Sequence, residues 1–184
     1  GGGWTRPHLA IYGHWLTAGH GILTLAQVIS GEVEDRIEQR RSALRLLRSF
    51  IEKQELEAFP AVVVAPYVSD GIESLVQCQG IGGLQSNTVL LGWPNDAARA
   101  DIFGSNLRLI SQLDRSIVAL RLRQLPGTDH FDESDAGSDP WEAPLGTIDV
   151  WWRGRKNGEL MLLLAHLLTQ TPEWRHRPIR LLRI

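Results

Sequence analysis

The sequence predicts an α/β fold with a mostly parallel sheet and helices on both of its faces. Apolar, β-rich runs alternate with helical patterns along the chain, which is typical of a parallel sheet. Val62-Val63-Val64 forms a continuous apolar run of the kind found in strands buried on both faces. Glu32–Leu56 carries apolar residues at helical spacing, with acids first and arginines later, an order that suits the helix dipole. A length of 184 residues fits one domain, so residues 1–184 are predicted to form a single α/β unit.

The individual elements follow from the same patterns. The predicted strands are His8–Gly13, Gly21–Ser30, Pro60–Tyr67, Thr88–Trp93, Ser116–Arg123, Thr147–Arg153 and Arg177–Ile184. The predicted helices are Glu32–Leu56, one capped by Ser69-Asp70 and ending at Gln79, one capped by Asn95-Asp96 with Ile102, Leu109 and Leu113 facing inward, and one from Asn157 or Gly158 to Trp174.

The connection between the first two predicted strands is too short. Only Gly13–His20 separates them, whereas a parallel crossover needs a dozen or more residues. Either the two strands form an antiparallel hairpin, or a helix is missing between them and His14–Ala18 is its tail. Two segments are predicted to lie outside the regular structure. Leu125–Gly146 is rich in Pro, Gly and acids and is expected to be an acidic flexible loop, and Gly1–Gly3 is left out of the fold.

Composition excludes several classes of function. A formal net charge of -2 and a pI near 6.3 argue against nucleic-acid binding driven by general electrostatics. Cys78 is the only cysteine, so no intrachain disulfide can form, which fits a reducing compartment. No apolar run approaches the ~20 residues that span a bilayer, so we expect no direct membrane insertion by this piece.

No pattern indicates an enzyme or a metal site. The histidines lack metal-ligand spacing, and His166 is expected to be a satisfied or surface residue. There is no Gly-x-Ser-x-Gly elbow, and Cys78, near a helix C-terminus, is expected to be a small buried residue. Asp149 is expected to accept hydrogen bonds from backbone amides. Trp151 and Trp152 should lie on opposite faces of their strand, one in the core and the other beneath a helix or at an interface.

A glycine-rich turn precedes the strand at Thr88. Glycines at positions 80, 82 and 83 permit unusual backbone angles or a close approach to the main chain. The order of helix, glycines and strand fits neither a Walker loop nor a dinucleotide fingerprint. Gly82, Gly83 and Ser86 are nevertheless the candidates for holding a nucleotide phosphate through backbone amides.

Several stretches, in the same order, resemble the cytosolic C-terminal region of cation–chloride cotransporters. Gly80–Val89 is similar to that family's Gly-x-Gly-Gly-x-x-x-Asn-Thr-Val stretch. The other stretches are Trp4–Pro7, resembling a Trp-Arg-Pro opening with one inserted residue, Thr147–Trp152, Asn157–Leu164, Glu173–Arg175 and Ile179-Arg180. Trp93 after Gly92 looks closest to the potassium–chloride branch, in a prokaryotic-like form.

The resemblance implies a non-catalytic domain at the cytoplasmic face of an integral membrane protein that couples chloride transport to potassium, sodium or both. Its expected role is regulation and dimerisation, and its expected partners are the transporter's own transmembrane domain and a second copy. The family's domain looks like a universal-stress-type fold, which keeps a nucleotide-sensing module open as the alternative. The resemblance also implies a second, similar half, which is absent or shortened after Ile184, and the phosphorylated segments of animal members find no counterpart.

Overall fold

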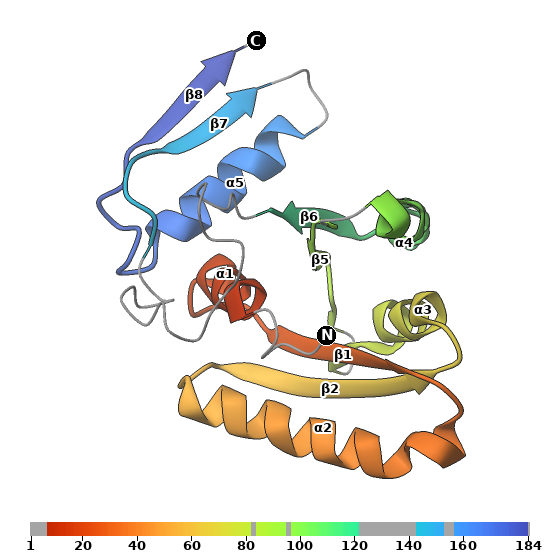
Figure 1. The fold of residues 1–184 in the computed structure, drawn as a ribbon. Coiled ribbons are helices and arrows are strands. Elements are labelled where there is room, and N and C mark those ends of the chain that lie inside the picture. The colour runs from red at the N-terminus through yellow and green to blue at the C-terminus, as the bar shows by residue number, and fades with distance from the viewer. Residues whose placement is uncertain (1–6, 82–83, 95–96, 122–142, 153–156, 184) are drawn as a thin grey trace.

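The computed structural model describes residues 7–81, 84–94, 97–121, 143–152 and 157–183. They form α1 (Pro7–Thr17), β1 (Leu23–Ser30), α2 (Val33–Lys53), β2 (Ala58–Ala65), α3 (Val68–Cys78), β3 (Gly80–Ile81), β4 (Leu84–Gln85), β5 (Thr88–Gly92), the short 3-10 helix η2 (Ala97–Arg99), α4 (Ala100–Gln112), β6 (Ser116–Leu120), β7 (Ile148–Trp152), α5 (Gly158–Thr169) and β8 (Ile179–Arg183) (Figure 1). The predicted α/β class is confirmed.

The first element corrects the sequence prediction. His8–Gly13, predicted as a strand, lies in α1, which begins at Pro7, a favoured first helical residue. A short apolar run cannot be assigned to helix or strand by periodicity alone, and here Ala10, Ile11 and Trp15 are all buried. The antiparallel hairpin and the missing helix were therefore both wrong, whereas the expectation that His14–Ala18 is the tail of a helix is confirmed for His14–Thr17. The helix is not missing, because it occupies the residues that had been assigned to the strand.

The best-packed part of the molecule is the β1–α2–β2 unit. β1 and β2 pair in parallel, with Leu23 opposite Ala58 and Ser30 opposite Ala65. Glu34 and Asp35 lie in the first turn of α2, as the dipole argument predicted. One apolar core joins α1, β1, α2 and β2, and it contains Ala10, Leu25, Ile29, Ala43, Leu47, Ile51, Leu56 and Val62.

Helices cover both faces of this strand pair. Leu25 and Ile29 of β1 pack with α2, whereas Val28, on the opposite side of the strand, meets α3 at Gly71. A Cβ at Gly71 would overlap the Val28 side chain, so glycine allows α3 to approach β1 closely. The predicted cap of α3 was wrong, because Tyr67 is the N-cap and Ser69 donates a hydrogen bond to the Asp70 carboxylate instead.

The strands pair in four separate two-stranded ladders instead of one continuous sheet. β1–β2, β5–β6 and β7–β8 are parallel, whereas the two-residue strands β3 and β4 are antiparallel. The parallel preference is therefore confirmed, but the described strands do not join across the molecule. α1 contacts both β1 and β5. A Cβ placed at Gly13 of α1 would lie 3.0 Å from the Leu23 side chain of β1 and 3.8 Å from the Leu90 side chain of β5.

Two helices differ from prediction in their details. The buried residues of α4 are Asn106 and Ile110, whereas Ile102, predicted to face inward, is 55% exposed. The predicted cap Asn95-Asp96 lies outside the described residues. α5 ends at Thr169 instead of Trp174, because Pro172 disfavours helical backbone at the preceding residue, Thr171. Of the predicted acidic loop, only residues 143–146 are described, and Ala143 is buried.

Candidate interaction surface

The C-terminal strand pair is covered by a helix on one side. α5 packs against β7, where the indole of Trp152 lies over Gly158 so closely that a Cβ at this glycine would overlap the ring. Val150 points to the same side as Trp152 and is buried. Gly158 is the first residue of α5. Because glycine has no side chain, the start of this helix can pack directly against Trp152 of β7.

The rest of this unit exposes large apolar side chains. Trp151 lies on the opposite face of β7 from Trp152, as predicted, but neither tryptophan is in the core: Trp152 is half-buried and Trp151 is 56% exposed. Leu181 of β8 is 59% exposed. The further exposed apolar residues of the unit are Ile179 on β8 and Leu162 and Leu163 on α5. We call these five exposed residues, Trp151, Leu162, Leu163, Ile179 and Leu181, the apolar surface. The register of β7 and β8 places Trp151 on the open face of the strand pair, and Ile179 and Leu181, opposite Ile148 and Val150, on the face that α5 covers at β7. Parallel strands are normally buried on both faces, so the exposure of these side chains is unusual.

A charged pair lies across the same two strands. Arg180 of β8 donates two hydrogen bonds to Asp149 of β7, Nε to Oδ1 at 2.8 Å and Nη2 to Oδ2 at 2.6 Å. The Thr147 hydroxyl donates a third, at 2.6 Å. These bonds from Arg180 and Thr147 lower the pKa of Asp149 from 3.8 to about 2. The expectation that Asp149 bonds backbone amides was wrong, because its side chain is satisfied by Arg180 and Thr147.

On either side of the glycines at positions 82 and 83, β3 and β4 pair antiparallel. Gly80 is required there, because a Cβ at this position would lie 2.6 Å from the Leu84 carbonyl oxygen of the opposing strand. Gly82 and Gly83, two of the three nucleotide candidates, lie outside the described residues. The third, Ser86, is half-buried and its backbone N–H donates to the Gln79 carbonyl at 3.4 Å. A phosphate at Ser86 would have to compete with that bond.

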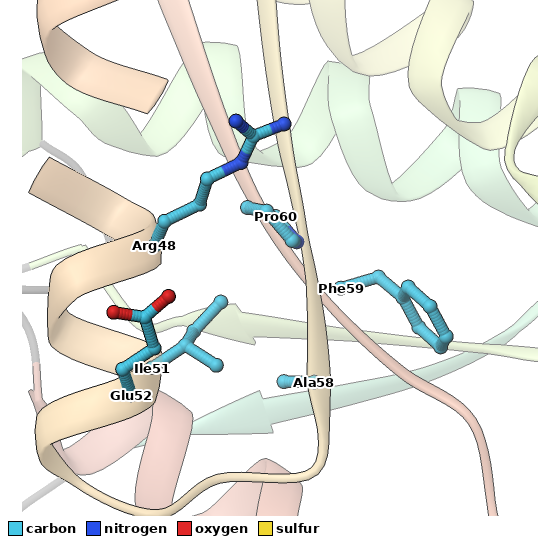
Figure 2. Close-up of a pocket in the computed structure, with 6 residues that line it drawn as sticks. All are labelled: Arg48, Ile51, Glu52, Ala58, Phe59 and Pro60. Atoms are coloured by element: carbon cyan, nitrogen blue, oxygen red, sulfur yellow. The ribbon is translucent and has the colours of Figure 1, made fainter. Parts of the chain in front are cut away.

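A shallow pocket of about 440 Å³ lies between the end of α2 and the start of β2. It is lined by Arg48, Ile51, Glu52, Ala58, Phe59 and Pro60, and Phe59 points away from the helix (Figure 2). Arg48 and Glu52 are the only charged or polar side chains among these six residues. We therefore do not consider this pocket a candidate catalytic or metal-binding site.

The outer edge of β2 is closed to strand pairing. Arg40 of α2 donates from Nε to the Val62 carbonyl at 3.1 Å, which shows that the backbone groups of Val62 point away from β1. Pro60 is two residues earlier, so its backbone faces the same edge and offers no N–H donor. Arginine and proline together protect this edge from another strand.

The remaining candidates carry no site. Cys78 is exposed, so the expectation of a buried cysteine was wrong, and His166 is exposed, within the prediction of a satisfied or surface residue. Within the residues that the structure describes, no group of three or more His, Cys, Asp or Glu side chains could hold a metal ion. None of the described helices combines the length and apolar character needed to cross a bilayer.

One cluster escaped the sequence analysis. Tyr12 and Trp15 of α1 meet Trp174, which follows α5, in edge-to-face contacts with ring centroids 5.0 to 6.2 Å apart. Ile11, Ala143, Ile148 and Leu168 surround them. We call Tyr12, Trp15 and Trp174 the aromatic cluster. Trp15 and Trp174 are 159 positions apart (174 − 15), so no local pattern could bring them together.

Comparison with known proteins decides the family. Residues 6–104, more than half of the 184 residues, match the sequence model of solute carrier family 12. The chain belongs to solute carrier family 12. It is also 29% identical over 165 residues to cation-chloride cotransporter 1 of Oryza sativa subsp. japonica. That match covers 89% of this chain and 16% of the rice protein, so this solute carrier family 12 chain spans a small part of its curated relative's length.

Proposed function

We propose that this chain is a non-catalytic regulatory and dimerisation domain of a membrane transporter that couples chloride transport to potassium, sodium or both. In this proposal it lies at the cytoplasmic face, as the C-terminal cytosolic domain, and acts on the transporter's own transmembrane part. Family membership supports the link to transport. The apolar surface carries the regulatory part of the proposal, because a surface of this kind on an α/β domain is expected to contact a partner.

The partner that we propose for the apolar surface is a second copy of the chain. Arg180 is already neutralised by Asp149, so two copies can approach without repulsion between these charges. Suppose that the β8 strands of two copies pair antiparallel, with Leu181 of one copy opposite Leu181 of the other. Arg183 of one copy then lies opposite Ile179 of the other, and no two like charges are opposite each other. The closed edge of β2 offers no comparable contact, which favours β8 as the pairing edge.

Sedimentation equilibrium of the purified chain tests this proposal. We expect a concentration-dependent dimer, and we expect Trp151→Ser to weaken it at least tenfold, because Trp151 lies on the strand next to the proposed β8 seam and a tryptophan that acts as an interface hot spot costs about 2 kcal/mol or more. Tyr67→Ser is the matched control, since Tyr67 is 70% exposed at the start of α3 and should leave the dimer unchanged. A chain that stays monomeric at high concentration, or a Trp151→Ser variant that dimerises like the wild type, would contradict the proposal.

A further inference from the structure

The helix α5 is apolar on more sides than the chain covers. Eight of its twelve residues are Leu, Met or Ala, yet among the described residues of this helix only Gly158 and Ala165 are buried. Leu162 is 37% exposed and Leu163 is 52% exposed. A helix that is apolar all round is normally buried all round, so the outer side of α5 lacks a cover.

The outer side of α5 carries a regular stripe of side chains. Glu159, Leu162, Leu163 and His166 are all exposed, and spacings of three and four residues place them on one face of the helix. Glu159 lies in the first turn of α5 and His166 in the last. The stripe therefore has two leucines at its centre, an acid towards one end and a histidine towards the other.

This order of residues is self-complementary. Suppose that the α5 helices of two copies pack antiparallel about a two-fold axis that passes between Leu162 and Leu163. Leu162 of one copy then lies opposite Leu163 of the other, and Glu159 of one copy lies opposite His166 of the other. The axis makes each contact twice, as in any symmetric dimer. Each contact between Glu159 and His166 joins opposite charges when the imidazole is protonated.

The proposed pairing of two β8 strands leads to the same arrangement of helices. Identical strands that pair antiparallel are related by a two-fold axis perpendicular to the sheet, so both α5 helices would lie on one face of the four strands. A helix is about 10 Å across and strands lie about 4.8 Å apart, so one helix covers about two strands. Two α5 helices can therefore meet above the two β8 strands and cover Ile179 and Leu181, which are 39% and 59% exposed in one copy.

We propose that the α5 helices of two copies pack antiparallel against each other, and that Glu159 and His166 select how the two copies align. This inference rests on the proposed function, because the partner is the same second copy. It adds a helix contact on the face of the strands opposite to Trp151, and it assigns the alignment of the dimer to two charged side chains.

Charge variants of α5 test the alignment by sedimentation equilibrium of the purified chain at low ionic strength. His166→Glu would place two acids opposite each other at both symmetric contacts, so we expect the Kd of the dimer to rise about threefold to tenfold. Combining it with Glu159→Arg reverses both charges and should bring the Kd back to within about twofold of the wild type. His20→Glu, at an exposed position after α1, makes the same change of net charge and should leave the Kd unchanged. A double variant that dimerises no better than His166→Glu alone would overturn the proposed alignment.

A leucine variant tests the centre of the same contact. Leu163→Gln should raise the Kd at least about tenfold, because each dimer loses two leucines from the contact between the helices. Leu46→Gln is the matched control, since Leu46 is 57% exposed on α2 and should not affect dimerisation. A Leu163→Gln variant that dimerises like the wild type would contradict the helix contact.

The outcomes separate this inference from the proposed function. A dimer that is weakened by Trp151→Ser but by none of the α5 variants would keep the proposed function and reject the helix contact. A dimer that is weakened by the α5 variants but not by Trp151→Ser would keep the helix contact and contradict the proposed β8 seam. A chain that stays monomeric would reject both.

Discussion

The two ends of the chain use the same motif, two parallel strands and the helix that connects or covers them, but they bury it to different extents. In the β1–α2–β2 unit, α2 and α3 cover opposite faces, and Arg40 and Pro60 close the outer edge. In the β7–α5–β8 unit, α5 covers β7 and leaves Trp151 and Leu181 more than half exposed. The difference shows that pairing two strands does not by itself bury their side chains or block their outer edges. Helices must also cover both faces of the strand pair, and side chains or proline must block its outer edge.

The largest expected effect lies in the N-terminal core. Leu47 is fully buried, whereas its neighbour Leu46 is 57% exposed on the same helix. We expect Leu47→Ala to lower the free energy of unfolding by about 2–5 kcal/mol, because it removes core contacts and leaves a cavity. Leu46→Ala should change it by less than about 0.5 kcal/mol. Urea denaturation measures both, and equal losses would contradict the assignment of the core to this face of α2.

The next effect tests how the C-terminal helix is seated. We expect Gly158→Ala to destabilise the chain by about 1–3 kcal/mol, because the new methyl group would overlap the Trp152 indole. Gly104→Ala is the matched control. Gly104 lies in α4 with open space around it, so alanine should stabilise that helix by about 0.5–1 kcal/mol. Thermal unfolding of the two variants should therefore shift in opposite directions, and a neutral Gly158→Ala would mean that α5 does not rest on β7 in this way.

The smallest effect concerns the charged pair of the C-terminal unit. The pKa of Asp149 is lowered from 3.8 to about 2, so the ionised carboxylate stabilises the folded chain above about pH 4. That contribution is lost as the pH falls from about 4 to about 2. Asp149→Asn should therefore be slightly less stable than the wild type at neutral pH and equally stable near pH 2, as measured by denaturation at each pH. Because the pair is solvent-accessible, added salt should shrink the difference, and a salt-independent difference would contradict an exposed pair.

Sequence patterns predicted the elements whose signal is local. Glu32–Leu56 shows its helical face and its charge order directly, and α2 lies within these bounds. The Val62–Val64 run indicated a buried strand, and β2 contains it. The prediction of a strand at His8–Gly13 was wrong, because an apolar run of six residues fits either a strand or a buried helix. Only tertiary packing decides between the two.

The candidate sites were harder to predict, because they depend on residues far apart in the chain. Asp149 meets Arg180 only because β7 and β8 pair in a register that brings them side by side. The aromatic cluster requires α1 to lie against the segment after α5, which no spacing rule encodes. The sequence predicted that Trp151 and Trp152 lie on opposite faces of their strand, but not which of them is exposed. Alternation along a strand shows which residues share a face, and it does not show which face is covered.

Hydrogen–deuterium exchange of the purified chain tests the contrast between the two units most directly. At low protein concentration, we expect the backbone amides of β1, α2 and β2 to exchange with protection close to that of global unfolding. Those of β7 and β8 should exchange faster, and should become protected when the concentration is raised until dimers form. Equal protection of both units in the monomer, unchanged by concentration, would contradict the proposal that a second copy covers the exposed side chains of the C-terminal unit.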